Sequence, residues 1–245
     1  MKLAHLVTSS GITVFVKGQP PFTMPKDHKL FEQLKKAAQA SDLDEVTSLI
    51  HAANKIETFT SGKVAIVDGE VTYEGEVVHN TLAETILGLI EEDENPQILI
   101  HFLENLMLNP SYHSREQLYG FLEKCDHPIT DDGRFIAYKW VRNDYKDAHS
   151  GTFDNSVGQI IKMDRSKVDD NPNRTCSAGL HVCSKGYGKF SDRLLAVAVN
   201  PRDVVSVPTD YNNSKMRVSE YEVIAELPVE AFEEGFKSSV YRVAG

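Results

Sequence analysis

The sequence predicts an α+β fold, with a small N-terminal sheet and a helical hairpin, a helical connector, and a C-terminal, mostly antiparallel β domain. Three observations predict it. Residues 1–79 combine alternating apolar runs with two capped helical segments, residues 80–125 show helical spacing throughout, and residues 126–245 are mostly short apolar runs between polar turns. The same ranges are the expected domains: an N-terminal α+β domain, a helical connector and a C-terminal β-rich domain.

The first elements are strands. Runs 3–7 and 12–16 alternate apolar with other residues, and the Ser-Ser-Gly segment 9–11 between them predicts a hairpin. The segment 19–25 contains three prolines, which exclude a helix or a central strand there.

Two helices and a meander complete the predicted N-terminal domain. Asp27 and Ser41 are good N-caps before apolar residues at helical spacing, so we expect a short helical hairpin. Residues 63–79 contain Asp-Gly and Glu-Gly turn signals and predict a three-stranded meander. We expect the first hairpin to pair with this meander in one sheet.

The sequence of the connector, residues 80–125, predicts three helices. Thr81 and Ser114 each precede a Glu or Gln at capping-box spacing, and Asn95 precedes a proline at a first helical position. The apolar stripes of these helices fit either a core or a subunit interface, and the sequence does not separate the two.

The segment 126–141 opens the β-rich domain. After an Asp-Gly turn, Ile136, Tyr138 and Trp140 would share one strand face, with Lys139 on the other. Because this is the chain's single tryptophan, we expect the most buried strand here. Further strands are expected within 157–163, 180–183, 194–199, 204–207 and 216–227, and a short helix and strand in the tail 228–245.

Composition is that of an ordinary globular protein, with 41% hydrophobic and 25% charged residues. The net charge of −10 argues against direct DNA binding, which needs clustered Lys and Arg. We expect no transmembrane segment, because no apolar run approaches the roughly 20 residues that span a bilayer. The N-terminus lacks a signal-peptide core, which indicates a cytoplasmic protein.

Cysteines and histidines gather in the second half of the chain. Cys176, His181 and Cys183, with Cys125 and His127, would be the ligands of a zinc site, but the Cys-x4-His-x-Cys spacing matches no common pattern. A Cys183 thiolate beside His181 would lack an Asn or Asp to orient the imidazole. We therefore predict free thiols, no metal ligand and no catalytic residue.

Five long motifs lie between residues 64 and 226. They are FLENLMLNPS (102–111), REQLYGFLEK (115–124), PITDDGRFIAYKWV (128–141), TCSAGLHVCS (175–184) and NPRDVVSVPTDYNNSKMRVSEYEV (200–223). As a set they resemble the rIIB-type proteins of tailed bacteriophages, a family of lysis control and exclusion evasion.

This resemblance implies a phage protein in the cytoplasm of the infected host or at the periphery of its inner membrane. It implies no established catalytic activity and no cofactor. The expected partners are further copies of the chain, an rIIA-like phage protein or a host defence protein. Some members begin with a helix-turn-helix-like segment, which this N-terminus does not match, so DNA binding is not carried over.

A second set of short motifs is similar in order to those of ADP-ribosyltransferase folds. Tyr138, Tyr187 after the GLHVCS segment 179–184, and Glu220 or Glu222 stand at the matching positions. The first strand departs from that family because it has no His or Arg at the matching place. The resemblance implies an ADP-ribosyltransferase-like C-terminal domain and, as an alternative function, an NAD- or nucleotide-binding enzyme.

The leading hypothesis is a non-enzymatic phage accessory protein that acts by binding as an oligomer; a structural self-assembling protein is a further alternative. Arg134 and Lys139, with Arg142 and Lys146, form a basic cluster that would bind an anionic ligand such as a nucleotide. The candidate ligand-binding residues are Arg134, Tyr138, Lys139, His181, Tyr187, Glu220 and Glu222.

Overall fold

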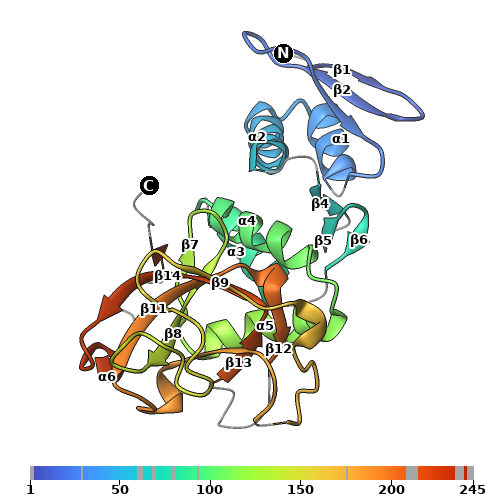
Figure 1. The fold of residues 1–245 in the computed structure, drawn as a ribbon. Coiled ribbons are helices and arrows are strands. Elements are labelled where there is room, and N and C mark those ends of the chain that lie inside the picture. Colours follow the sequence, from blue (N-terminus) through green and yellow to red (C-terminus); the bar gives the residue numbers. More distant parts are fainter. Residues whose placement is uncertain are drawn as a thin grey trace. The chain divides into compact units, whose positions relative to one another are not determined.

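The computed structural model divides into two compact units, Met1–Ile100 and His101–Gly245, each considered by itself (Figure 1). The α+β class is confirmed, with small sheets and helices in the first unit and a large antiparallel sheet in the second. The three-domain division stays a prediction. The structure describes residues 3–28, 30–59, 63–67, 70–78, 81–92, 94–174, 176–207, 215–234 and 240–241.

The first sheet confirms the N-terminal hairpin and adds a strand to it. β2 lies between β1 and β3, and Ile12, Val14 and Met24 are buried from one face of the sheet. They pack with the helical hairpin of α1 and α2 in one apolar cluster. The proline-rich segment supplies an edge strand, the position that proline tolerates. The bounds are β1 (Ala4–Val7), β2 (Gly11–Phe15), β3 (Phe22–Pro25), α1 (Phe31–Ala40) and α2 (Leu43–Phe59).

The meander forms a sheet of its own, so the expectation of one shared sheet is wrong. β2 pairs with β1 on one edge and with β3 on the other, and β4, β5 and β6 form a second three-stranded sheet among the described residues. Among the expected turns, Glu74-Gly75 has positive φ at both residues, and Asp68-Gly69 lies outside the described residues. The strands are β4 (Val64–Val67), β5 (Glu70–Tyr73) and β6 (Glu76–Val77).

The three expected connector helices are confirmed as α3 (Thr81–Glu91), α4 (Gln97–Met107) and α5 (Tyr112–Lys124). The predicted cap of α5 is wrong by three residues. Ser111 is the N-cap and accepts a hydrogen bond from the Ser114 backbone N–H. Ser114 is instead buried, and its hydroxyl donates to the Val205 carbonyl at 2.8 Å, which ties α5 to the large sheet.

The second unit is built on a sheet in the order β12-β13-β10-β8-β11-β14-β9. β8 is buried at every residue, as the sequence predicts. It pairs with β11 along its full length but with β10 only at Tyr138 and Cys183. The bounds are β7 (Ile129–Thr130), β8 (Phe135–Val141), β9 (Ile160–Lys162), β10 (Leu180–Cys183), β11 (Arg193–Val199), β12 (Val204–Ser206), β13 (Lys215–Val218), β14 (Glu220–Leu227) and β15 (Val240–Tyr241).

The two faces of β8 differ as the alternation predicts. Tyr138 and Trp140 pack edge-on against Phe232 of α6 (Ala231–Glu234), with ring centroids 5.0 and 5.2 Å apart. Lys139 lies on the opposite face, 5.3 Å from the ring centroid of Tyr221 on β14. The expected tail helix and strand are α6 and β15, and β15 pairs with β7 in parallel.

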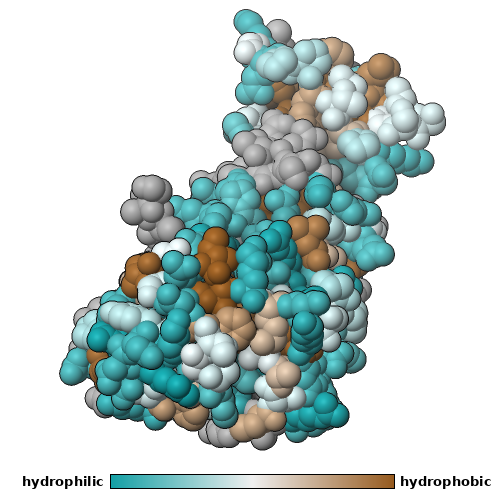
Figure 2. Space-filling model, viewed as in Figure 1, coloured by the Kyte–Doolittle hydropathy of each residue, from teal (hydrophilic) through white to brown (hydrophobic). Residues whose placement is uncertain are grey.

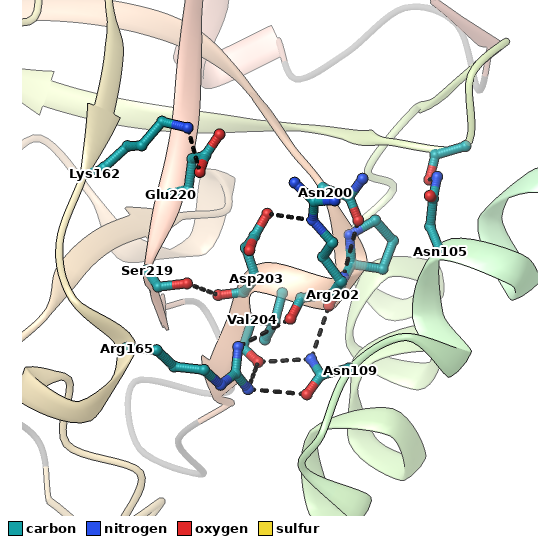
Figure 3. A network of polar contacts seen from close by, with 12 residues as sticks. Asn105, Asn109, Lys162, Arg165, Asn200, Arg202, Asp203, Val204, Ser219 and Glu220 are labelled. Carbon is teal, nitrogen blue, oxygen red and sulfur yellow. Dashed lines mark hydrogen bonds and ion pairs between the residues drawn. The ribbon is translucent and has the colours of Figure 1, made fainter.

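A polar network joins the end of α4 to the turn before β12 (Figure 3). The fully buried Asn109 donates to the carbonyls of Pro201 and Val204 at 2.8 and 2.7 Å and accepts from Arg165 at 2.9 Å. Arg165 also donates to the Arg202 carbonyl at 2.9 Å. This buried amide therefore ties the segment after α4 to the turn before β12.

We expect Asn109→Ala to lower the free energy of unfolding by about 2–4 kcal/mol, because the Pro201 and Val204 carbonyls would each lose one of two donors and Arg165 would lose an acceptor. Urea unfolding followed by circular dichroism measures the change. Asn105→Ala is the matched control on the same helix. Its half-buried amide donates to Asp132 and Gly133 near solvent, so a loss of only about 1 kcal/mol is expected there. Equal losses for the two variants would contradict the role given to Asn109.

The viewed face of the second unit is mostly hydrophilic, with hydrophobic residues in small separate groups (Figure 2). Within the described part of the chain, no helix combines the length and the apolar character that crossing a membrane requires.

Candidate functional site

A pocket of about 490 Å³ is lined by residues of both β8 and β10, the two strands that pair at a single position. Residues of the loop 147–153, the loop 176–179 and strands β13 and β14 complete it. The buried Lys139, Lys215 and Tyr221 line it together with the exposed His149 and Phe190. The pocket therefore runs from solvent to the buried face of the sheet.

Lys139 is a buried cation in this pocket and is 8% exposed. Its Nζ donates to the His181 carbonyl at 2.9 Å, and no carboxylate of the described residues forms an ion pair with it. Burial lowers the pKa of Lys139 to about 8, against small opposing effects of Cys183 and Asp147. Burial of an ammonium group without a carboxylate partner costs free energy, and a nearby negative charge would reduce that cost.

The potential around His181 is positive. Burial, followed by the charges of Lys139, Lys215 and Arg217, lowers the pKa of His181 to about 3, so the imidazole is neutral near pH 7. Its Nε2 atom is buried without a hydrogen-bond partner among the described residues, and so is the indole Nε1 of Trp140. Both residues line the pocket.

The thiol of Cys183 is not an activated nucleophile. Burial raises its pKa to about 12, and the nearby Lys139 and Lys215 lower that pKa only in part. The Sγ atom donates to the Tyr138 carbonyl at 3.5 Å. A protonated thiol next to a neutral imidazole cannot work as a thiolate–imidazolium pair near pH 7.

Aromatic rings form one wall of the pocket. The rings of Tyr187 and Phe190 are 5.9 Å apart, and His149 lies 6.2 Å from Phe190. The Nζ of the buried Lys215 is 5.4 Å from the centroid of Tyr187. Phe190 is 52% exposed, so the aromatic wall reaches the opening.

The loop at the opening is held by Asp147. Its carboxylate accepts backbone hydrogen bonds from Ser150, Thr152 and Phe153 at 2.7–2.9 Å. Burial raises its pKa, but these bonds outweigh burial and lower the pKa to about 2. The carboxylate is therefore ionised and occupied in shaping the loop.

The structure places the predicted ligand-binding residues in two separate pockets, except for one residue that lies in the core. Lys139, His181 and Tyr187 line the 490 Å³ pocket. Tyr138 is 1% exposed and packs in the core. The remaining candidates, which are Arg134, Glu220 and Glu222, line a separate pocket of about 190 Å³.

In the smaller pocket the charges are paired. Arg134 contacts Glu222 at 2.6 Å and Asp132 at 2.7 Å. Lys162 contacts Glu220 at 3.0 Å (Figure 3). The three positions matched to the ADP-ribosyltransferase motifs therefore do not share one pocket. The predicted basic cluster of Arg134, Lys139, Arg142 and Lys146 does not share one pocket either. The Arg142 guanidinium donates hydrogen bonds to carbonyls of its own loop.

Sequence reasoning missed Lys215, Trp140 and Tyr221 as lining residues. A signal for Lys215 exists, since Lys215 and Arg217 occupy alternate positions of a short strand whose other residues are apolar. Two cations on one face of a buried strand indicate a polar interior. Among the described residues, no group of three or more His, Cys, Asp and Glu side chains is placed to hold a metal ion.

Comparison with known proteins gives one consistent result. A family model described as Bacteriophage T4 protein rIIB matches residues 3–232, a range that includes the whole 490 Å³ pocket. The chain is 41% identical over 220 residues to Protein rIIB of Enterobacteria phage T4, which covers 88% of this chain and 70% of that relative. No solved structure matches.

Proposed function

Because this chain belongs to the rIIB family of bacteriophage proteins, we propose that it is a phage accessory protein that acts by binding, in lysis control and in evasion of host or prophage defence. The match over nearly the whole chain is the observation that carries this proposal. The protein works in the cytoplasm of the infected host or at the periphery of the inner membrane.

The state of the reactive groups supports binding over catalysis. The Cys183 thiol is protonated, and the His181 imidazole is neutral. Asp147 is committed to its loop, and Glu220 and Glu222 are in ion pairs. Groups held in this way shape a surface and are poorly placed to transfer protons.

The partner is a further copy of the chain, an rIIA-like phage protein or a host defence protein. The net charge of −10 favours a partner with a basic surface, because opposite charges speed association and exclude wrong partners.

Affinity purification of the tagged chain from infected cells, with chemical cross-linking, tests this proposal. We expect one phage or host protein, or the chain itself, to be cross-linked reproducibly, and we expect the mass of the purified chain in solution to exceed that of a monomer. Cells that express the tag alone are the control. A strict monomer that cross-links to no protein above this control would contradict the proposal.

A further inference from the structure

Lys139 is a buried amine in the 490 Å³ pocket, and the proposed function does not use it. We propose that Lys139 binds an aromatic aldehyde covalently, as an imine at Nζ, with the ring of the ligand packed against the aromatic residues that line the pocket. The pocket is then a reversible covalent site for a small molecule. This site goes beyond the proposed protein-binding function and does not depend on it.

The contacts of Nζ place the amine at the wall of the pocket. Nζ donates to the His181 carbonyl at 2.9 Å and lies 5.3 Å from the ring centroid of Tyr221. Both of these residues line the same pocket as Lys139. The residue is otherwise removed from solvent, since it is only 8% exposed. The pocket therefore gives a small molecule access to an amine that is shielded from bulk water.

Burial of Lys139 favours the neutral amine, which is the form that attacks a carbonyl carbon. Within the described part of the chain, its one hydrogen bond goes to a neutral carbonyl and no carboxylate forms an ion pair with it. Desolvation therefore lowers the pKa of Lys139 to about 8. The pKa of an ordinary lysine is about 10.4, so near pH 7.5 the neutral fraction of Lys139 is roughly a hundredfold larger or more. Lysines that are desolvated in this way are typical of imine-forming sites.

Imine formation at Nζ needs no reactant other than the aldehyde. The ammonium form first gives one proton to water. The neutral amine then attacks the carbonyl carbon, and a C=N bond replaces the C=O bond as the oxygen leaves in water with the two amine hydrogens. Nothing is oxidised or reduced. A protonated imine keeps one N–H, which can donate to the His181 carbonyl as the amine does.

The lining of the pocket favours an aromatic body on the aldehyde. Tyr187 and Phe190 line it with their ring centroids 5.9 Å apart, and the His149 ring lies 6.2 Å from that of Phe190. Aromatic rings pack favourably against one another at separations of this size. The volume of about 490 Å³ falls within the range of pockets for small organic ligands, so an aldehyde with a single ring fits.

Trapping of the imine in the full chain tests the proposal. The chain is equilibrated with benzaldehyde near pH 7.5 and reduced with sodium borohydride, and peptide mass spectrometry measures the benzyl-lysine at each position. We expect benzaldehyde to half-fill Lys139 at a concentration at least about tenfold lower than at Lys124, because desolvation favours the reactive neutral amine. Lys124 is an exposed lysine of α5 that does not line the pocket.

The pH dependence of the trapping gives a second readout. At a fixed benzaldehyde concentration, the occupancy of Lys139 should rise through pH 8 and level near pH 9, because an amine with a pKa of about 8 is then mostly neutral. Nα-acetyl-lysine in the same solution is the reference, and its occupancy should keep rising to about pH 10. Identical profiles for the two amines would contradict the proposal.

Two variants assign the adduct to the pocket. At a benzaldehyde concentration that gives the folded chain one adduct by intact mass, Lys139→Met should lose that adduct. Lys162→Met makes the same change at an exposed lysine of β9 outside the pocket and should keep it. Circular dichroism confirms that each variant is folded. Should Lys139→Met not fold, peptide mapping of the unaltered chain carries the test.

Acetaldehyde tests the aromatic part of the proposal. It forms the same imine but has no ring to pack against Tyr187 and Phe190. Its preference for Lys139 over Lys124 should therefore be at least about threefold smaller than that of benzaldehyde. Equal preferences of the two aldehydes would overturn the assignment of an aromatic ligand.

Two further outcomes overturn the covalent site itself. The first is that benzaldehyde fills Lys139 no more readily than Lys124. The second is that the strongest adduct maps to another lysine, such as Lys215, which also lines the pocket. Loss of partner capture with intact imine formation would contradict only the proposed function, so the two proposals fail separately.

Discussion

Arg217→Met is expected to lower the free energy of unfolding of the second unit by about 3–5 kcal/mol. Arg217 is fully buried. Its guanidinium donates to the carbonyls of Asp169, Asn171 and Arg174 at 2.6–2.7 Å and to the Ser206 hydroxyl at 3.0 Å. Methionine fills the volume but leaves three partly buried carbonyls and the buried Ser206 hydroxyl without that donor, and an acceptor that loses its donor away from water costs free energy.

Urea unfolding of purified protein measures this loss. Arg202→Met is the matched control in the same unit, because the Arg202 side chain is 49% exposed and its contact with Asp203 is a surface ion pair. We expect the control to change the free energy by no more than about 0.5 kcal/mol. A cost below about 1 kcal/mol for Arg217→Met would show that the loop 169–174 does not depend on this guanidinium.

Lowering the pH from 6.5 to 4.5 is expected to destabilise the second unit by about 5 kcal/mol through His127 and His181. Burial lowers the pKa of His127 to about 4, and burial together with nearby cations lowers that of His181 to about 3. At a pH between these folded-state pKa values and the ordinary histidine pKa of about 6.5, both histidines are protonated in the unfolded chain and neutral in the folded chain. The stability is therefore complete above pH 6.5 and falls by about 1.4 kcal/mol per pH unit for each histidine.

His127→Asn tests the first of these contributions. The His127 Nδ1 atom lies 2.7 Å from the Ile136 carbonyl, and an asparagine amide supplies a donor at the same place without a titrating ring. We expect the variant to lose about half of the pH dependence between pH 6.5 and 4.5. Unfolding curves at pH 8, where neither protein carries the extra proton, provide the internal reference. An unchanged slope would exclude His127 as a source of the acid sensitivity.

Much of the fold follows from local signals. The single tryptophan predicted the burial of β8, and the alternation predicted the opposite faces of Tyr138 and Lys139, because strand side chains alternate whatever the strand pairs with. Strand pairing did not follow. That β10 meets β8 at one position depends on contacts between segments far apart in the sequence, and β3 follows β2 closely but contains a proline, which gave no strand signal.

The candidate site was predictable only in part, for the same reason. Lys139, His181 and Tyr187 were predicted from separate motifs. All three line the pocket beside β8 and β10, which pair at a single position. Glu222 was predicted from its place on a late strand. It forms an ion pair with Arg134 and does not line the 490 Å³ pocket. The alternation of Lys215 with Arg217 in a short apolar strand is a local signal of a polar interior, but the place of Lys215 beside Tyr187 depends on the tertiary fold.

The most direct test of the central claim, that this chain performs the binding role of its family, is complementation. A host is chosen on which phage T4 without its own Protein rIIB forms few plaques, and this chain is supplied from a plasmid. We predict that plaque formation is restored, and that Lys162→Met restores it equally well. A chain that is expressed and folded in that host, yet leaves the plaque count at the level of the empty plasmid, would contradict the account.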